Sequence, residues 1–199
     1  MFEPAEIHSL FDLSHTAAAA LLQTLRYPWE ALPKIGALIL ELGRSLPAGE
    51  YELPAIIGPG TEVRQCAFVR GNALVGADCV VGNSTELKNV ILFDGVQVPH
   101  YNYVGDSILG YKAHMGAGSI TSNIKSDKTN VCFHAGGEQI ETGLRKIGAM
   151  LGDHVEVGCN TVLNPVVGRE TTIYPLSMVR GFVPPHSIYK HAGEIAERK

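Results

Sequence analysis

The sequence predicts a mainly β protein, a parallel β-helix of hexapeptide repeats preceded by an α-helical segment. Apolar residues stand at every sixth position, namely Ile57, Val63, Val69, Val75, Val81, Leu87 and Phe93. Small residues follow four positions after the first five of them, and glycine directly follows several. A helix repeats at 3.6 residues and a strand at two, so a period of six fits neither alone. It is the signature of a β-helix.

Residues 1–50 form a separate helical segment. Helix formers run from Thr16 to Leu25, with Asp12 or Ser14 as a cap, and a second helix is expected from Trp29 to about Leu46. Pro33 falls near the first turn of that helix, where a missing N–H does little harm. Its apolar face has spacings of three and four: Ile35, Leu38, Ile39, Leu42 and Leu46. This face must lie on the β-helix or on a neighbouring subunit.

Residues 51–190 are assigned to the β-helix. Each repeat supplies one flat side of a triangular coil, with the apolar residue inside and glycine or a polar residue at the corner. Past Pro99 the repeat slips to steps of five, to Val104 and Leu109, and residues 122–145 interrupt it as an inserted loop. After the repeats resume, the step from Leu163 to Val167 is short. Residues 191–199 are expected to be a tail or short helix.

Departures from a regular repeat tend to mark sites. The period slips beside His100 and is interrupted after Asn123, so the candidate site is placed there. Arg70 and Lys88 each follow a core position and are eighteen residues apart, which is one full turn of three repeats. They are therefore expected to stack on adjacent coils at one corner and to form an anion site.

Bulk composition excludes several classes of protein. The formal net charge of -4 gives no reason to expect nucleic-acid or anionic-membrane binding. The longest apolar runs fall far short of the ~20 residues needed to span a bilayer, and the acidic N-terminus does not resemble a secretion signal. The four cysteines form no C-x-x-C pair. We therefore expect a cytoplasmic protein with reduced, buried thiols.

Three polar strings carry a resemblance to a known family. They are E-L-K-N from Glu86, H-x-x-Y-x-G-D from His100 and G-A-G-x-I-T-x-N from Gly116. With Phe68-Val69-Arg70, they resemble the acetyltransferase domain of the bacterial bifunctional N-acetylglucosamine-1-phosphate uridylyltransferase/glucosamine-1-phosphate acetyltransferase, over residues 55–190. The chain also looks like shorter pyrophosphorylase-related proteins that lack the nucleotidyltransferase domain and share a G-L-R-K segment, here residues 143–146.

The resemblance implies a left-handed β-helix, a homotrimer with sites between subunits, and acetyl transfer from acetyl-CoA to an amino-sugar phosphate or nucleotide sugar. His100 matches the family's catalytic base, a role suited to imidazole at neutral pH. Asp106, six residues on, is a candidate to orient it. The residues that match substrate-binding positions are Arg70, Lys88, Tyr103, His114 and Asn123. Those on the acetyl-CoA side are Ala117, Cys159 and Lys190.

The match to the family is incomplete. No Gly-rich nucleotide loop precedes the repeats, so uridylyl transfer is not expected. His114 stands where the family has asparagine, and Ile124 replaces a tyrosine. Cys159 and Pro175 replace small residues beside acetyl-CoA, so the sugar-phosphate half matches better than the coenzyme half.

Two alternatives stay open. One is a non-catalytic protein that binds a sugar phosphate or nucleotide sugar. The other is a structural trimer whose helical arm recruits a partner, in which His100 would be an ordinary surface histidine. A zinc site is set aside, because the spacing of His114, His134 and His154 does not match the histidine-ligated β-helix enzymes. No metal is expected for acetyl transfer.

Overall fold

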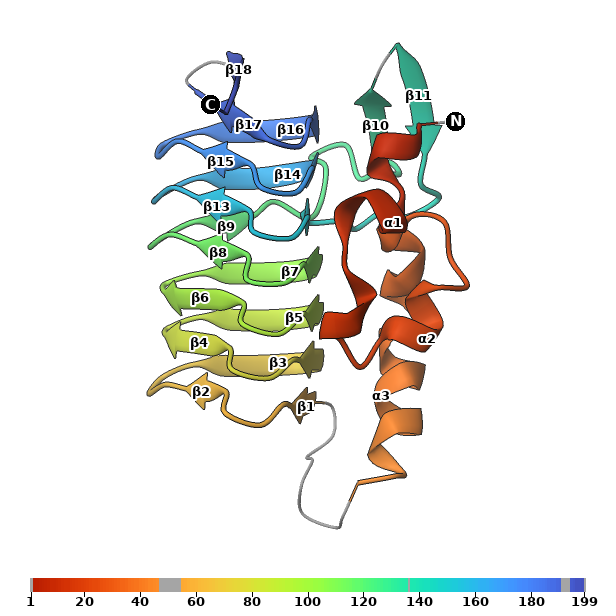
Figure 1. The fold of residues 1–199 in the computed structure, drawn as a ribbon, viewed down its shortest axis with the longest axis vertical. Helices are drawn as coiled ribbons and strands as arrows, with labels where there is room; N and C mark the ends of the chain where they lie inside the picture. The colour runs from red at the N-terminus through yellow and green to blue at the C-terminus, as the bar shows by residue number, and fades with distance from the viewer. Residues whose placement is uncertain (1, 47–54, 136, 191–193, 199) are drawn as a thin grey trace.

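The computed structural model describes residues 2–46, 55–135, 137–190 and 194–198 (Figure 1). One column of stacked β coils runs the length of the molecule, and the N-terminal segment lies along one of its sides. This arrangement confirms the predicted β-helix. The expected boundary between residues 50 and 51 lies outside the described residues.

The N-terminal arm, residues 2–46, contains short helical pieces. They are η1 (Glu3–Ala5), α1 (Ile7–Leu10), η2 (Leu13–His15), α2 (Ala19–Leu22), η3 (Pro28–Lys34) and α3 (Ile35–Gly43). The helix expected over Thr16–Leu25 shortens to α2. The second expected helix begins as a 3₁₀ segment that contains Pro33, because proline cannot donate to an α-helical hydrogen-bond ladder.

The coil has three sides, and short strands form the first. They are β2 (Glu62–Val63), β4 (Val80–Asn83), β6 (Gln97–His100), β8 (His114–Met115), β13 (Glu156–Val157), β15 (Thr172–Ile173) and β17 (Ser187–Tyr189). Neighbours in this stack pair in parallel.

Longer strands cross from the second side to the third. They are β3 (Phe68–Val75), β5 (Glu86–Leu92), β7 (Tyr103–Leu109), β14 (Val162–Val167) and β16 (Met178–Val183). The second side also contains β9 (Ile120–Thr121), and the third contains β1 (Ala55–Ile57) and β12 (Met150–Leu151). All of these pair in parallel.

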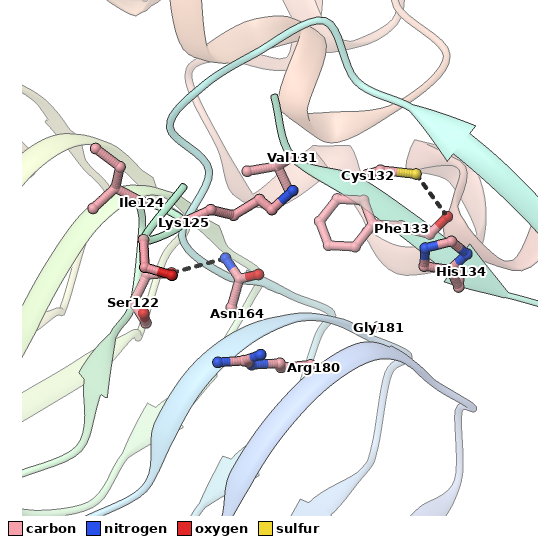
Figure 2. Close-up of a pocket in the computed structure, with 11 residues that line it drawn as sticks. Ser122, Ile124, Lys125, Val131, Cys132, Phe133, His134, Asn164, Arg180 and Gly181 are labelled. Atoms are coloured by element: carbon pink, nitrogen blue, oxygen red, sulfur yellow. Dashed lines mark hydrogen bonds between the residues drawn. The ribbon is translucent and has the colours of Figure 1, made fainter. Parts of the chain in front are cut away.

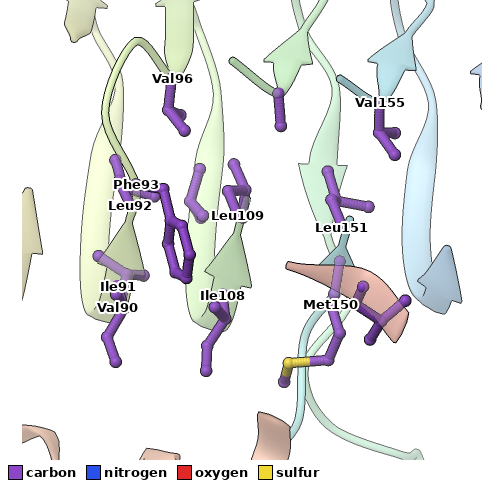
Figure 3. Packing of buried hydrophobic residues seen from close by; sticks show 14 of the residues in the cluster. Val90, Ile91, Leu92, Phe93, Val96, Ile108, Leu109, Met150, Leu151 and Val155 are labelled. Carbon is purple, nitrogen blue, oxygen red and sulfur yellow. The ribbon is translucent and has the colours of Figure 1, made fainter. Parts of the chain in front are cut away.

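The third side is buried on both of its faces. Its inward row contains Val75, Leu92, Leu109, Leu151, Val167 and Val183, and its outward row contains Leu74, Ile91, Ile108, Met150 and Val166. These residues are at most 2% exposed, and Figure 3 shows several of them stacked from coil to coil. The arm covers the outward row, since α3 contacts β1, β3 and β5. The predicted apolar helix face, with Ile35, Leu38 and Ile39 buried, therefore lies on the β-helix.

One buried carboxylate fastens the arm. Asp153 accepts hydrogen bonds from the backbone N–H of Asp12 at 2.6 Å and of Tyr111 at 2.8 Å. Its own N–H donates to the Leu10 carbonyl at 3.0 Å. Burial raises the pKa of the Asp153 carboxyl above its usual value, and the two N–H donors oppose that shift.

The length of a coil shrinks along the column. Val63 pairs with Val81, eighteen residues on; Val81 pairs with Val98, seventeen on; Ile173 pairs with Tyr189, sixteen on. The residues are lost at one corner only, where the second side meets the third. We call it the variable corner; it consists of residues 70–72, 88–89, 105–106, 122–148, 164–165 and 180–181.

Core steps across this corner show how it tightens. The step is six residues from Val69 to Val75, five from Leu87 to Leu92 and from Val104 to Leu109, and four from Leu163 to Val167 and from Val179 to Val183. The short step noted in the sequence is therefore a tighter corner that the next coil repeats.

The predicted register near His100 was wrong by one residue. Leu92, not Phe93, stands opposite Val75, and Val98, not Pro99, stands opposite Val81. Phe93 faces outward instead and packs on Phe11 of the arm, with ring centroids 5.1 Å apart. Each correct core residue has an apolar neighbour, so the sequence allowed both registers.

The inserted loop lies at the variable corner. It contains an antiparallel hairpin, β10 (Cys132–Ala135) with β11 (Glu138–Glu141), and Ile124 bridges to Lys146 at its base. Phe133 lies 5.1 Å from the Trp29 ring, so the hairpin contacts the arm.

The C-terminus forms a strand where a tail or short helix was expected. β18 (Ile195–Glu197) pairs antiparallel with β17. A strand is favoured here because it satisfies backbone groups that the last coil would leave unpaired. Among the described residues, no helix is long and apolar enough to span a membrane.

The cysteines are free thiols, as expected, but they are not all buried. Cys66 and Cys159 are exposed at a corner, Cys132 is half-buried and Cys79 is buried. Burial raises the pKa of the Cys79 thiol to about 11. Corner positions face outward, which explains why two cysteines escape the core.

Candidate functional site

A polar cluster centred on Asp106 occupies the variable corner. Lys88 Nζ lies 2.9 and 3.0 Å from the two carboxylate oxygens of Asp106. The side-chain amides of Asn89 and Asn123 donate to the same carboxylate at 3.0 and 2.6 Å. Asp106 is only 4% exposed. A buried carboxylate needs such partners, because an unpaired charge is costly away from water.

Backbone conformation explains the residue types in this cluster. Asn72, Asn89 and Asp106 have φ values of 45°, 56° and 49°. Asn and Asp tolerate this left-handed region better than other non-glycine residues. The three positions are seventeen residues apart, and Asn123 follows after another seventeen. The tightened corner thus aligns their side chains on adjacent coils.

Tyr103 extends the cluster onto the second side, and Arg70 lies at its lower end. The Tyr103 hydroxyl accepts a hydrogen bond from Asn123 at 3.2 Å. Arg70 Nη1 lies 3.1 Å from Glu86 Oε1. A bulge falls between Val69 and Gly71, so Arg70 has no residue directly opposite and does not stack on Lys88 as its spacing suggested. Both cations still lie at the same corner.

A second group lies where the first side meets the second. This histidine corner comprises residues 65–66, 83–84, 100–101, 117–118, 159–160 and 175–176. The His100 carbonyl accepts from Gly118 N at 3.0 Å, and the Ala117 carbonyl accepts from Asn160 N at 2.9 Å. His100, Ala117 and Cys159 therefore stand on consecutive coils along one edge. His100 and Cys159 are exposed.

Asn102 holds this corner in shape. Its side-chain oxygen accepts from His100 N at 3.0 Å, while its amide donates to Gly116 O at 2.9 Å and Ser119 O at 3.0 Å. The suggestion that Asp106 orients His100 is not supported, because the Asp106 carboxylate is bonded to the lysine and amides of the other corner.

Two further candidates lie apart from both groups. His114 is on the first side, with Nδ1 2.8 Å from Glu156 Oε2 on the next coil. Lys190 follows β17 and bonds Glu194 at 3.0 Å. The described chain brings neither of them to the Asp106 cluster.

An exposed apolar column separates the two corners. Pairing on the second side aligns the outward residues Phe68, Glu86, Tyr103, Ile120, Val162 and Met178. Phe68 is 56% exposed, Ile120 38% and Met178 63%, while Leu176 at the histidine corner is 75% exposed. Glu86, which pairs with Arg70, interrupts this column, but its exposed apolar residues are typical of an interaction surface.

The sequence analysis did not predict that the inserted loop contributes cationic side chains beside the Asp106 cluster. A pocket of about 620 Å³ opens beside Asp106, between Leu32 and Pro33 of the arm and three cations of the loop. The cations are Lys128, Arg145 and Lys146. The G-L-R-K string and the seventeen-residue spacing of Asn and Asp were the available signals. No group of three or more His, Cys, Asp or Glu side chains suited to a metal occurs in the described ranges.

Comparisons with known proteins agree with this architecture. Residues 51–180 match the GMPPB C-terminal domain family. The bifunctional protein GlmU of Methanococcus vannielii is 37% identical over 113 residues, 57% of this chain and 26% of the relative. A bifunctional sugar-1-phosphate nucleotidylyltransferase/acetyltransferase of Sulfurisphaera tokodaii is 33% identical over 153 residues, 72% of this chain and 37% of the relative.

A solved structure shares the fold. It is a mutant of AntD, an N-acyltransferase from Bacillus cereus, in complex with dTDP and coenzyme A. The TM-score is 0.56 at 18% identity, over 87% of this chain and 91% of that one. The chain spans between a quarter and two fifths of the two curated relatives. It belongs to the GMPPB C-terminal domain family and is related to the GlmU proteins through the acetyltransferase region.

Proposed function

We propose that the protein is an acyl-CoA-dependent N-acetyltransferase that acts on an amino-sugar phosphate or a nucleotide sugar. The observation that carries the proposal is the alignment of His100 with Ala117 and Cys159 along one edge, across the second side from the Lys88–Asp106 cluster. The relatives' names, which include acetyltransferase and N-acyltransferase, support the same class of reaction.

His100 acts as the general base in this proposal. The amine of the sugar attacks the thioester carbonyl, so a C–N bond forms and the C–S bond breaks. The imidazole takes the proton that the amine loses, and the departing thiolate receives a proton. The exposed position of His100 suits contact with a substrate.

The Asp106 cluster supplies the anion site. An ammonium group has three N–H donors, and Lys88 directs its charge toward the two oxygens of one carboxylate. Asp106, which Asn123 holds through its amide, fixes the position of Lys88, which can offer a remaining donor to a phosphate. Arg70 adds a second cation at the same corner.

A homotrimer would complete the site. The two corners lie at opposite edges of the second side, and the apolar column of Phe68, Ile120 and Met178 lies between them. Burial of this column against a second copy would bring the histidine corner of one subunit toward the variable corner of another. The exposed apolar residues support this arrangement.

Thiol release tests the activity directly. The protein is incubated with acetyl-CoA and either glucosamine 1-phosphate or a nucleotide-linked amino sugar, and free coenzyme A is followed. We expect release with one acceptor class and a 10²- to 10⁴-fold loss in His100→Ala. His8→Ala, at an exposed histidine of the arm, is the matched control. No release with any acceptor, or equal release by His100→Ala, would refute the proposal.

A non-catalytic binding protein is the second candidate. The observation that favours it is Cys159, an exposed thiol where the family has a smaller residue on the acetyl-CoA side. Calorimetry decides between the two: binding of a sugar nucleotide with no affinity for acetyl-CoA supports the second candidate.

A further inference from the structure

A second pocket lies higher on the variable corner, between the inserted hairpin and the upper coils (Figure 2). Its volume is about 710 Å³. Its lining comes from the start of the inserted loop, from β10 and from the corner residues of β14 and β16, and includes Lys125, Phe133, His134, Asn164 and Arg180. Unlike the pocket beside Asp106, it has no carboxylate in its lining.

The pocket has two cationic side chains, Arg180 and Lys125, and one histidine, His134, from separate segments. Arg180 belongs to β16, Lys125 to the loop and His134 to β10. Figure 2 shows the Asn164 side chain between Lys125 and Arg180. Lys125 contacts Asp127 at 3.4 Å, outside the lining. The exposed Arg180 guanidinium offers a planar fork that suits a phosphate oxygen pair.

Strand register connects this pocket with the candidate site. Arg180 pairs with Asn164, whose amide donates to Ser122 O at 2.8 Å and to Ile147 O at 2.6 Å. Lys88 pairs with Gly105 on the same edge of the second side, lower in the column. The pocket is therefore the upper continuation of the corner that holds the Asp106 cluster.

The size and the apolar side chains indicate more than an inorganic ion. Ile124 lies on one side of the pocket and Val131 and Phe133 lie across from it (Figure 2), and Phe133 is held against the buried Trp29 ring. Pockets of a few hundred Å³ with apolar walls and a few placed polar groups hold ligands of nucleotide size. We propose that this pocket binds the nucleoside diphosphate part of a ligand, with Arg180 on the phosphates.

Two ligand sources share this chemistry, a sugar nucleotide and coenzyme A. The inference goes beyond the proposed reaction, because the pocket can bind either one whether or not His100 transfers an acyl group.

Trp29 provides an intrinsic fluorescence probe of this pocket. Trp29 is the one tryptophan of the chain and touches Phe133, so its fluorescence should respond when the pocket fills. The 199-residue chain is titrated with UDP, coenzyme A and inorganic pyrophosphate, with calorimetry in parallel. We expect saturable binding of UDP or coenzyme A, weaker binding of pyrophosphate, and weakening with salt. The tighter of the first two identifies the source.

Arg180→Ala should weaken this binding at least tenfold, and Arg180→Lys should restore part of it. Arg64→Ala, at a half-buried arginine of the first side that pairs with Glu62, should leave it unchanged. Thiol release by His100→Ala is a separate measurement, so the two proposals fail separately. No saturable binding of UDP or coenzyme A, or unchanged affinity in Arg180→Ala, would overturn the inference.

Discussion

The histidine corner and the variable corner both turn the chain from one side of the coil to the next, but they do so with different numbers of residues. At the histidine corner every coil turns with one residue at positive φ: Cys66, Ser84, Tyr101, Gly118, Asn160 and Leu176. At the variable corner the core step falls from six residues to five and then to four, and one coil carries the inserted loop. The fixed corner gives a straight edge, whereas the variable corner gives pockets and a buried ion pair.

The difference shows where a repeat can change without losing its core. The inward rows continue through every coil, because each coil must stack its apolar residues on the next. A corner faces outward, so residues can be removed or added there at little cost to the core. Asp106, the inserted cations and Arg180 all belong to the corner that changes.

The largest effect is expected from breaking the ion pair of the variable corner. Asp106→Ala removes the acceptor of Lys88, Asn89 and Asn123 and leaves a poorly hydrated ammonium unpaired. We expect a loss of about 3–5 kcal/mol in the free energy of unfolding, measured by urea denaturation.

Asp78→Ala is the matched control for this prediction. Asp78 also has a left-handed φ, 53°, but it is exposed at the third corner of the coil. Its replacement should cost about 1 kcal/mol, the cost of alanine in that conformation. Equal losses in the two variants would mean that the buried ion pair adds nothing to the corner.

The fold and the two corners were predictable to different degrees. The six-residue period from Ile57 to Leu87 was sufficient for the β-helix, since buried apolar positions repeat with the coil. The adjacent pairs Leu92-Phe93 and Val98-Pro99 hid the true register, because the arm gives Phe93 an outward-facing place to be buried. The periodicity of the repeats does not reveal that the N-terminal arm covers the outward face of the third side.

The candidate site shows the same division. The resemblance named His100 as the base and put Ala117 and Cys159 on the acetyl-CoA side; the register adds that all three belong to one corner on successive coils. The family resemblance did not reveal that Asp106 bonds Lys88 rather than His100. Which side chains meet at this corner depends on whether the core step there is six residues or five. The seventeen-residue spacing of Asn72, Asn89, Asp106 and Asn123 carried that information.

A smaller effect is expected where the arm meets the third side. In Asp153→Asn one acceptor becomes an amide donor that faces a backbone N–H of Asp12 or Tyr111. We expect a loss of about 1–3 kcal/mol in the free energy of unfolding, with little change at either corner. An unchanged melting midpoint would show that Asp153 does not fasten the arm.

The pH dependence of stability gives a second test of Asp153. Its pKa is raised in the folded state, so the folded protein binds more protons than the unfolded chain between the usual and the raised values. The contribution of Asp153 to stability therefore falls as pH rises through that interval. The difference in the free energy of unfolding between the wild type and Asp153→Asn should therefore fall as pH rises through that interval. A difference that does not change with pH would mean that the folded protein leaves the pKa of Asp153 at its usual value.

Chemical modification of the cysteines should have the smallest effect on stability. It allows two thiols of the histidine corner, Cys66 and Cys159, to be compared directly. Cys66 and Cys159 are exposed, while burial raises the pKa of Cys79 to about 11. Iodoacetamide should modify the first two in the native protein and Cys79 only in denaturant, because the thiolate is the reactive form. Peptide mass spectrometry reports each site.

Since Cys159 lies beyond Ala117 on the edge assigned to acetyl-CoA and Cys66 lies two coils below His100, coenzyme A should slow the modification of Cys159 alone. Equal protection of both thiols, or of neither, would remove the coenzyme from this edge.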